Sequence, residues 1–71
     1  MALDIILNGK ESTLENVSTL ADLLVEIDID PVSSRGVAVA INEEIVRRPD
    51  WNTRQLQSGD EVELVTARQG G

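Results

Sequence analysis

Residues 19–27 read Thr-Leu-Ala-Asp-Leu-Leu-Val-Glu-Ile and combine a helix start with a helical repeat of apolar side chains. Thr19 followed three residues later by Asp22 is a capping-box pattern, in which the hydroxyl and the carboxylate each accept a hydrogen bond from a backbone N–H. Ser18 is an alternative cap. The apolar residues spaced by three and four form one stripe: Leu20, Leu23, Leu24 and Ile27. We therefore predict a helix that ends before Pro31 and packs this stripe on a sheet.

Segments typical of strands flank the predicted helix on both sides. Asn8-Gly9 favours a type I′ turn that joins the first two of them, and Asn42-Glu43 indicates a second tight turn. One helix covers one face of one sheet. The sequence therefore predicts an α+β fold, a mixed sheet of about five strands with one helix packed on one face. The predicted strands are residues 3–7, 10–15, 37–41, 44–46 and 61–66.

The segment between the last two predicted strands is less regular. Residues 47–50 are expected to break the fourth strand, and residues 51–56 read as irregular or as one helical turn. Trp51 is interpreted as a lid over the edge of an aliphatic core rather than as a recognition residue. The pairs Asp28/Asp30 and Glu43/Glu44 lack the spacing of a calcium loop, so we interpret them as solvated surface.

Composition restricts the chemistry that the chain can perform. Its 71 residues suffice for one domain with one modest core, and neither cysteine nor histidine is present. A thiol nucleophile, a disulfide and a thiolate metal site are therefore excluded. The net charge of -7 disfavours nucleic acid and anionic membranes as partners. Because the N-terminus lacks the basic start of a signal peptide, and no apolar run is long enough to span a bilayer, we expect a soluble cytoplasmic protein.

The chain ends in Gly70-Gly71, which chance composition rarely produces. We predict a compact domain over residues 1–67 followed by a flexible tail over residues 68–71. Glycine has no Cβ, so the last two residues can pass through a narrow channel and leave the terminal carbonyl carbon open to attack. In the same tail, Arg68 either steers the chain toward acidic groups of a partner or is simply solvated, and Gln69 follows it.

Several stretches together resemble the sulfur carriers of thiamine biosynthesis, which have the ubiquitin-like β-grasp fold. The resemblance covers essentially the whole chain, although the order of residues 47–49 before Trp51 departs mildly from the family pattern. It further implies that the first and last strands lie parallel at the centre of the sheet. The stretches that carry the resemblance are Asn8-Gly9, residues 19–24, residues 37–46, Trp51, residues 58–65 and Gly70-Gly71.

The resemblance implies a carrier and substrate, not an enzyme. An adenylating enzyme would use ATP and magnesium to activate the carboxylate of Gly71, and this chain itself would bind no cofactor and no metal. A sulfur donor such as a cysteine desulfurase would then supply the sulfur for a thiocarboxylate, since the chain has no cysteine to form a persulfide. Thiazole synthase would receive the sulfur. Gly70, Gln69 and Arg68 would thread the active site of the partner.

Four apolar residues are expected on the sheet face away from the helix, and we interpret them as a docking patch for these partner enzymes. They are Ile6, Ala38, Ala40 and Val65.

Two other functions remain open from the sequence. Related carriers with the same fold and terminal glycines deliver sulfur to molybdopterin, to cysteine or to a thiolated RNA. Alternatively, the chain is a ubiquitin-like modifier, whose carboxylate forms an isopeptide bond with a lysine, or an interaction module that forms no bond.

Overall fold

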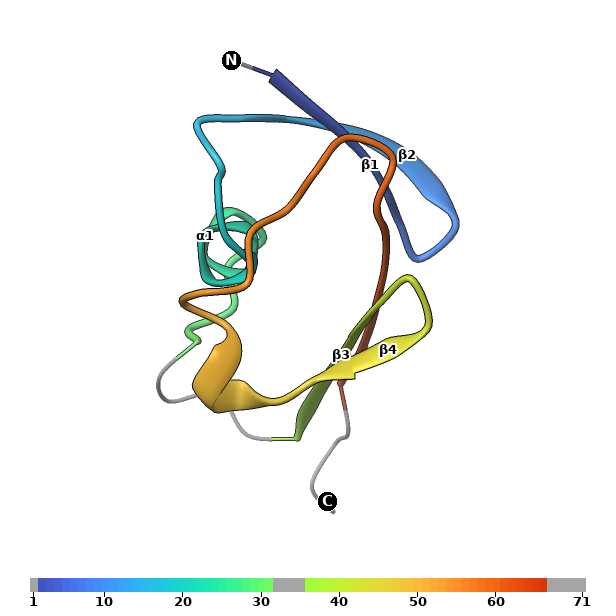
Figure 1. Cartoon of the computed structure of the whole chain (residues 1–71). Coiled ribbons are helices and arrows are strands. Elements are labelled where there is room, and N and C mark those ends of the chain that lie inside the picture. Colours follow the sequence, from blue (N-terminus) through green and yellow to red (C-terminus); the bar gives the residue numbers. More distant parts are fainter. Residues whose placement is uncertain (1, 32–35, 67–71) are drawn as a thin grey trace.

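A computed structural model of the chain describes residues 2–31 and 36–66. Within these residues the order of elements is strand, strand, helix, strand, strand, a short 3₁₀ helix and a last strand (Figure 1). The predicted helix and the five predicted strands are confirmed to within a residue or two at each end. Their bounds are β1 Ala2–Leu7, β2 Lys10–Glu15, α1 Leu20–Glu26, β3 Val37–Ile41, β4 Glu44–Val46, η1 Arg48–Asp50 and β5 Glu61–Thr66.

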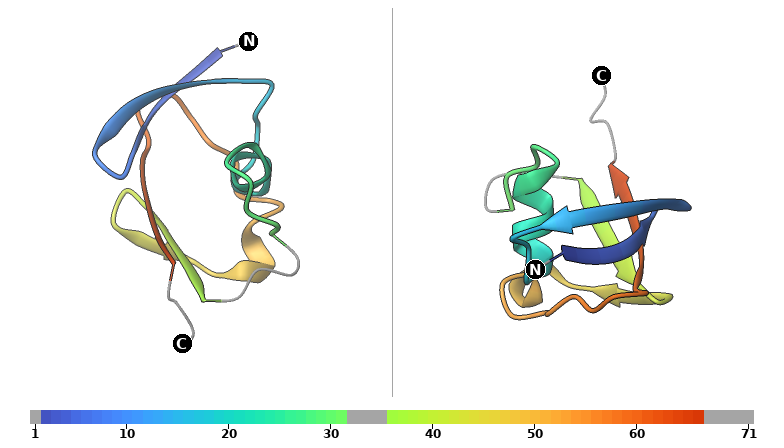
Figure 2. Two further views of the ribbon diagram at one scale, coloured as in Figure 1. Left: turned by 180° about the vertical axis from the view of Figure 1, so that it is seen from behind. Right: turned by 90° about the horizontal axis from the view of Figure 1, so that it is seen from above.

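The five strands form one mixed sheet in the order β2-β1-β5-β3-β4. β1 and β5 are parallel, with Ile6 opposite Glu61 and Leu7 opposite Val62, and the other pairs are antiparallel. The last strand therefore lies at the centre of the sheet beside the first, as the resemblance implied. Helix α1 covers one face of this sheet (Figure 2).

Helix α1 is capped at both ends, by side chains at its N-terminus and by a backbone turn at its C-terminus. Thr19, not Ser18, is the cap: its Oγ1 accepts from the backbone N–H of Asp22, and an Asp22 carboxylate oxygen accepts from the backbone N–H of Thr19 and of Ser18. At the other end Asp28 adopts a φ of 65°, and the N–H of Ile29 donates to the carbonyl of Leu24 at 2.7 Å. This Schellman closure ends the helix well before Pro31.

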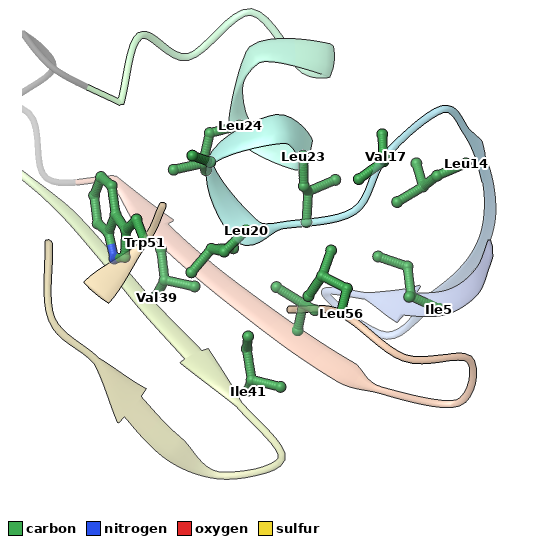
Figure 3. Close-up of a cluster of buried hydrophobic side chains, with 12 residues drawn as sticks. Ile5, Leu14, Val17, Leu20, Leu23, Leu24, Val39, Ile41, Trp51 and Leu56 are labelled. Carbon is green, nitrogen blue, oxygen red and sulfur yellow. The ribbon is translucent and has the colours of Figure 1, made fainter. Parts of the chain in front are cut away.

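The core lies between α1 and the inner face of the sheet (Figure 3). The helix stripe provides three fully buried leucines, while Ile27, at the end of the helix, is only half-buried. This single layer of aliphatic packing is the main source of stability in so small a domain. Its buried members are Ile5, Leu14, Val17, Leu20, Ala21, Leu23, Leu24, Val39, Ile41, Trp51, Leu56 and Val62.

Trp51 closes one end of the core, as predicted, and is only 2% exposed. Its indole Nε1 donates to the carbonyl of Val46 at 2.9 Å, which satisfies the one polar atom of the ring. The guanidinium of Arg48 lies 4.7 Å from the ring centroid on the outer side and also donates to the carbonyl of Pro31. The indole therefore joins β4 to the core, and Arg48 connects the indole to the segment after the helix.

The 3₁₀ helix begins earlier than the sequence indicated. We expected residues 47–50 to be a break and any helical turn to lie within 51–56, whereas η1 spans Arg48–Asp50. Pro49 sits in its first turn, where the ring fixes φ and the missing N–H is not needed, so the proline begins the turn instead of only ending the strand. No helix among residues 2–31 and 36–66 is long and apolar enough to cross a membrane.

Candidate functional site

The outer face of the sheet, away from α1, carries a compact apolar surface near the C-terminal half of β5. The strand register places Ala38 opposite Val65 and Ala40 opposite Ile45, so their side chains share this face. Val65 is 61% exposed and Ile45 is 73% exposed. We call Ala38, Ala40, Ile45 and Val65 the outer patch.

Acidic side chains border the outer patch. Glu63 lies directly opposite Ala40, and Glu43 follows in the turn that joins β3 to β4. Both carboxylates help to line the hollow of about 340 Å³ that contains the patch. An apolar centre with an anionic rim is complementary to a partner surface that is apolar at its centre and basic at its edge.

The structure brings together three of the four residues predicted for the docking patch. Ala38, Ala40 and Val65 are neighbours, but Ile6 is opposite Glu61 at the other end of β5. On the same face, Glu61 lies beside Ile6, and Glu63 lies between Glu61 and Val65. The prediction that Ile6 lies next to the other three residues is therefore wrong. β1 pairs with β5 only as far as Val62, so Ile6 lies beside the start of β5, whereas Val65 lies near its end.

Ile45 is the member of the outer patch that sequence reasoning missed. The missed signal lies in the two-residue turn Asn42-Glu43, which pairs Ile41 with Glu44 and therefore Ala40 with Ile45. Counting the register from that turn places Ile45 on the same face as Ala40.

The rest of the outer face is markedly acidic. Thr13 Oγ1 donates to Asp4 Oδ1 at 2.8 Å across β1 and β2, which orients one of these carboxylates. No three Asp or Glu side chains within residues 2–31 and 36–66 are grouped so as to hold a metal ion. The acidic side chains alternate on the outward positions of three strands: Asp4, Glu11, Glu15, Glu61 and Glu63.

Two asparagines from the hairpin turns hold β5 on its opposite edges. Asn8 Oδ1 accepts from the N–H of Leu64 at 2.8 Å on the β1 side. On the β3 side, Asn42 Oδ1 accepts from the N–H of Glu61 at 3.0 Å, and Asn42 Nδ2 donates to Asp60 Oδ1 at 3.0 Å. Sequence reasoning assigned these asparagines to turns only. Their side chains fix the strand from which the C-terminal residues continue.

The buried carboxylate of Asp60 belongs to the same anchor. It is 8% exposed, and its second oxygen accepts from the N–H of Gln57 at 2.8 Å. Both carboxylate oxygens are thus hydrogen-bonded, as burial of a charge requires. The turn into β5 is therefore closed by side chains as well as by backbone.

The predicted tail residues Arg68, Gln69, Gly70 and Gly71 lie outside the described residues. Thr66, the last described residue of the chain, ends the central strand β5. Gly71, the residue predicted to carry the sulfur, therefore follows five positions after the end of β5, which is paired with β3 from Val62 to Thr66.

This architecture defines a class of protein. A mixed sheet with parallel first and last strands at its centre and one helix across one face is the ubiquitin-like β-grasp fold. The chain belongs to the ThiS family, whose sequence model matches residues 5–71.

Similar proteins agree in sequence and in structure. The sulfur carrier protein ThiS of Thermus thermophilus is 40% identical over 65 residues, which cover 92% of this chain and 95% of that protein. The crystal structure of the thiamine biosynthesis protein ThiS of Geobacter metallireducens has a TM-score of 0.78 at 27% identity, covering 97% of this chain and 100% of the other. A solution structure of a thiamine biosynthesis protein from the same organism has a TM-score of 0.77 at 27% identity, over 97% and 88% of the two chains.

Proposed function

We propose that this chain, a sulfur carrier of thiamine biosynthesis by its family, carries sulfur on the terminal carboxyl group of Gly71 as a thiocarboxylate. The observation that carries the proposal is the extent of the family match, which runs through Gly70-Gly71 to the end of the sequence. The chain acts as a carrier and not as a catalyst. The sulfur is destined for the thiazole ring of thiamine.

The chemistry follows from the weakness of a carboxylate as an electrophile. The Gly71 carboxylate attacks the α-phosphorus of ATP on an adenylating enzyme, which forms an acyl adenylate and releases pyrophosphate. Hydrosulfide then attacks the acyl carbon and expels AMP, which leaves the thiocarboxylate. Where the donor is a cysteine desulfurase, its persulfide attacks the acyl carbon and expels AMP, and an external thiol then reduces the resulting acyl disulfide to the thiocarboxylate. ATP and magnesium are bound by the adenylating enzyme, and this chain binds neither. Because the reaction needs ATP, we assign it to the cytoplasm.

The outer patch supports the proposal that this chain docks on an adenylating enzyme and on thiazole synthase. An apolar surface of four residues with Glu43 and Glu63 at its rim fits an adenylating enzyme whose docking surface is apolar with a basic edge. Thiazole synthase uses the same surface at a later step, because the carrier presents one tail and one sheet face to both enzymes. Arg68, Gln69 and Gly70 occupy the channel that leads to each active site.

Intact mass spectrometry tests the chemistry directly. After incubation with an adenylating enzyme, ATP and sulfide, we expect a mass gain equal to one oxygen replaced by one sulfur. Gly71→Val, or one extra residue after Gly71, abolishes adenylation while the circular dichroism spectrum is unchanged. Normal turnover of either variant by the enzyme would refute the assignment of Gly71.

Introduction of a negative charge into the outer patch tests the docking surface. Ala40→Asp and Ile45→Asp each place a carboxylate among the apolar residues and should weaken binding to the adenylating enzyme at least tenfold, about 1.4 kcal/mol. Val25→Asp is the matched control, because Val25 is 61% exposed on the helix. Unchanged affinity of both patch variants, measured by titration calorimetry, would contradict the proposal.

Two experiments separate this function from its alternatives. Deletion of the gene should abolish growth without added thiamine, whereas a carrier for another pathway would leave that growth intact. Mass spectrometry of the protein from cells should show the thiocarboxylate, whereas a ladder of larger adducts would indicate a protein modifier.

A further inference from the structure

The two edges of β5 differ over its C-terminal half. The hydrogen bond from the N–H of Asn42 to the carbonyl of Glu61 shows that the odd-numbered residues direct their backbone toward β3. The even-numbered residues therefore face β1, and the N–H of Asn8 donates to the carbonyl of Val62 at 2.9 Å. On the β3 side the pairing continues to Thr66, but on the β1 side it stops after Val62.

Asn8 extends the parallel ladder by one step with its side chain. In a regular parallel pair the main-chain carbonyl of Asn8 would accept from the N–H of Leu64. The backbone of Asn8 turns away instead, with a φ of 49°, and Oδ1 takes the place of that carbonyl at 2.8 Å. The next groups on this edge are the carbonyl of Leu64 and the N–H of Thr66, and no hydrogen bond joins either one to another described residue.

This edge is accessible from outside the molecule. Thr66 is exposed, and Figure 2 (right) shows β5 continuing past the β1–β2 hairpin with nothing from β1 or β2 beside its last residues. A hollow of about 400 Å³ lies where β1 leaves β5, lined by Ile6, Asn8, Gly9, Glu61, Val62 and Glu63. Its apolar wall and two carboxylates suit a side chain with an apolar stem and a cationic head, that is, a lysine or arginine.

We propose that the β1-side edge of β5 at Leu64 and Thr66 is a strand-addition site for an extended, basic segment of the adenylating enzyme. The segment donates a backbone N–H to the carbonyl of Leu64 and accepts from the N–H of Thr66, and it places a lysine or arginine in the hollow beside Glu61 and Glu63. The sheet then continues from the carrier into the enzyme. This inference rests on the proposed function, since it assigns a second contact to the same partner.

The position of the strand-addition site explains how pairing there assists adenylation of Gly71. Main-chain pairing at Thr66 fixes the direction of the chain immediately before the tail, five residues from the carboxyl group that must reach the α-phosphorus of ATP. The outer patch holds the face of the sheet, whereas the strand edge determines where the tail begins. Ordering the last residue of β5 in this way removes conformational freedom before the reaction and not during it.

Removal of one N–H tests the pairing. Thr66→Pro deletes the donor at a position where no described group accepts from it, so the fold is retained, and Thr66→Ala is the matched control that keeps the donor. We expect Thr66→Pro to weaken binding to the adenylating enzyme roughly tenfold and Thr66→Ala to leave it within about twofold. Equal affinity of the two variants would overturn the strand-addition site.

Amide hydrogen exchange in the unmodified protein tests the same pairing without any substitution. The Thr66 amide should exchange rapidly in the free protein and become protected in the complex, whereas the Val65 amide, which faces β3, should be slow in both. Unchanged exchange of Thr66 in the complex would overturn the inference even if Thr66→Pro failed to fold. If the unmodified protein is not adenylated at all, the proposed function fails; if it is adenylated but Thr66 is not protected, only the strand addition fails.

Discussion

The β1–β2 and β3–β4 hairpins have the same kind of turn but different residues in it. Asn8-Gly9 and Asn42-Glu43 both have positive φ at the two central positions, 49° and 81° in the first and 52° and 71° in the second. This is the type I′ pattern, for which glycine is the preferred second residue. Glu43 therefore adopts a conformation that side-chain-bearing residues avoid, at a cost of about 1–2 kcal/mol.

The comparison shows that the asparagine, and not the second residue, connects each turn to the rest of the sheet. Both asparagines reach the central strand, but Asn42 makes two side-chain hydrogen bonds, one of them to the buried Asp60, whereas the Asn8 side chain makes one. The stronger anchor accompanies the less favourable turn residue. We infer that the contacts of Asn42 offset the cost of Glu43.

The largest expected effect comes from removing the stronger anchor. Asn42→Ala leaves one oxygen of the buried Asp60 carboxylate without its amide donor and should reduce the free energy of unfolding by about 3 kcal/mol. Asn8→Ala loses one hydrogen bond to a backbone N–H and should cost about 1 kcal/mol. Urea unfolding followed by circular dichroism measures both. Equal losses would contradict the unequal roles of the two asparagines.

Exchanging the second turn residues should give smaller effects of opposite sign. Glu43→Gly relieves the positive φ and should stabilise the fold by about 1 kcal/mol, whereas Gly9→Glu should destabilise it by a similar amount. A Cβ at Gly9 would meet no atom within 4 Å, so the loss there comes from the backbone alone. Thermal unfolding of the two variants and of the double exchange measures this difference. A stabilising Gly9→Glu would show that the two turns are not equivalent.

The smallest expected effect on stability comes from Asp22 at the start of α1, outside both hairpins. It serves as a reference for the substitutions in the hairpins. Backbone N–H groups of Thr19 and Ser18 hold the pKa of Asp22 below its usual value, and the Thr19 hydroxyl adds to this effect. A lowered pKa in the folded state stabilises the protein above the usual aspartate pKa of about 3.9 and loses that contribution as the pH falls through the lowered value.

Asp22→Asn should therefore be less stable than the unmodified protein near neutral pH, and the two should converge as the pH falls below about 4. Denaturant unfolding at a series of pH values measures this difference. The Asn8→Ala difference, which involves a backbone N–H and no carboxylate, should change less over the same range. A constant difference between Asp22→Asn and the unmodified protein would show that the carboxylate charge does not contribute.

The local features of the fold could be predicted from the sequence because each depends on neighbouring residues. Thr19 and Asp22 specify the helix start, and Asn8-Gly9 specifies the first turn. Asn42-Glu43 indicated the second turn, although glutamate stands there where glycine is usual. The parallel pairing of the first and last strands came from the family resemblance, since no local pattern encodes it.

The parts that sequence reasoning missed depend on register between strands distant in the chain. Ile6 is separated from the outer patch because β1 stops beside Val62, and Ile45 joins it because a two-residue turn sets its partner. The side-chain contacts of Asn8 and Asn42 with β5 span 56 and 19 residues. Their geometry is fixed only once the whole sheet has formed.

The burial of Trp51 has a practical consequence for every experiment above. The chain contains one tryptophan and no tyrosine, so its near-ultraviolet absorbance and fluorescence come from a single indole. That indole is packed at the end of the core and is almost completely buried. Its emission therefore reports unfolding of the domain from one site, without any added label.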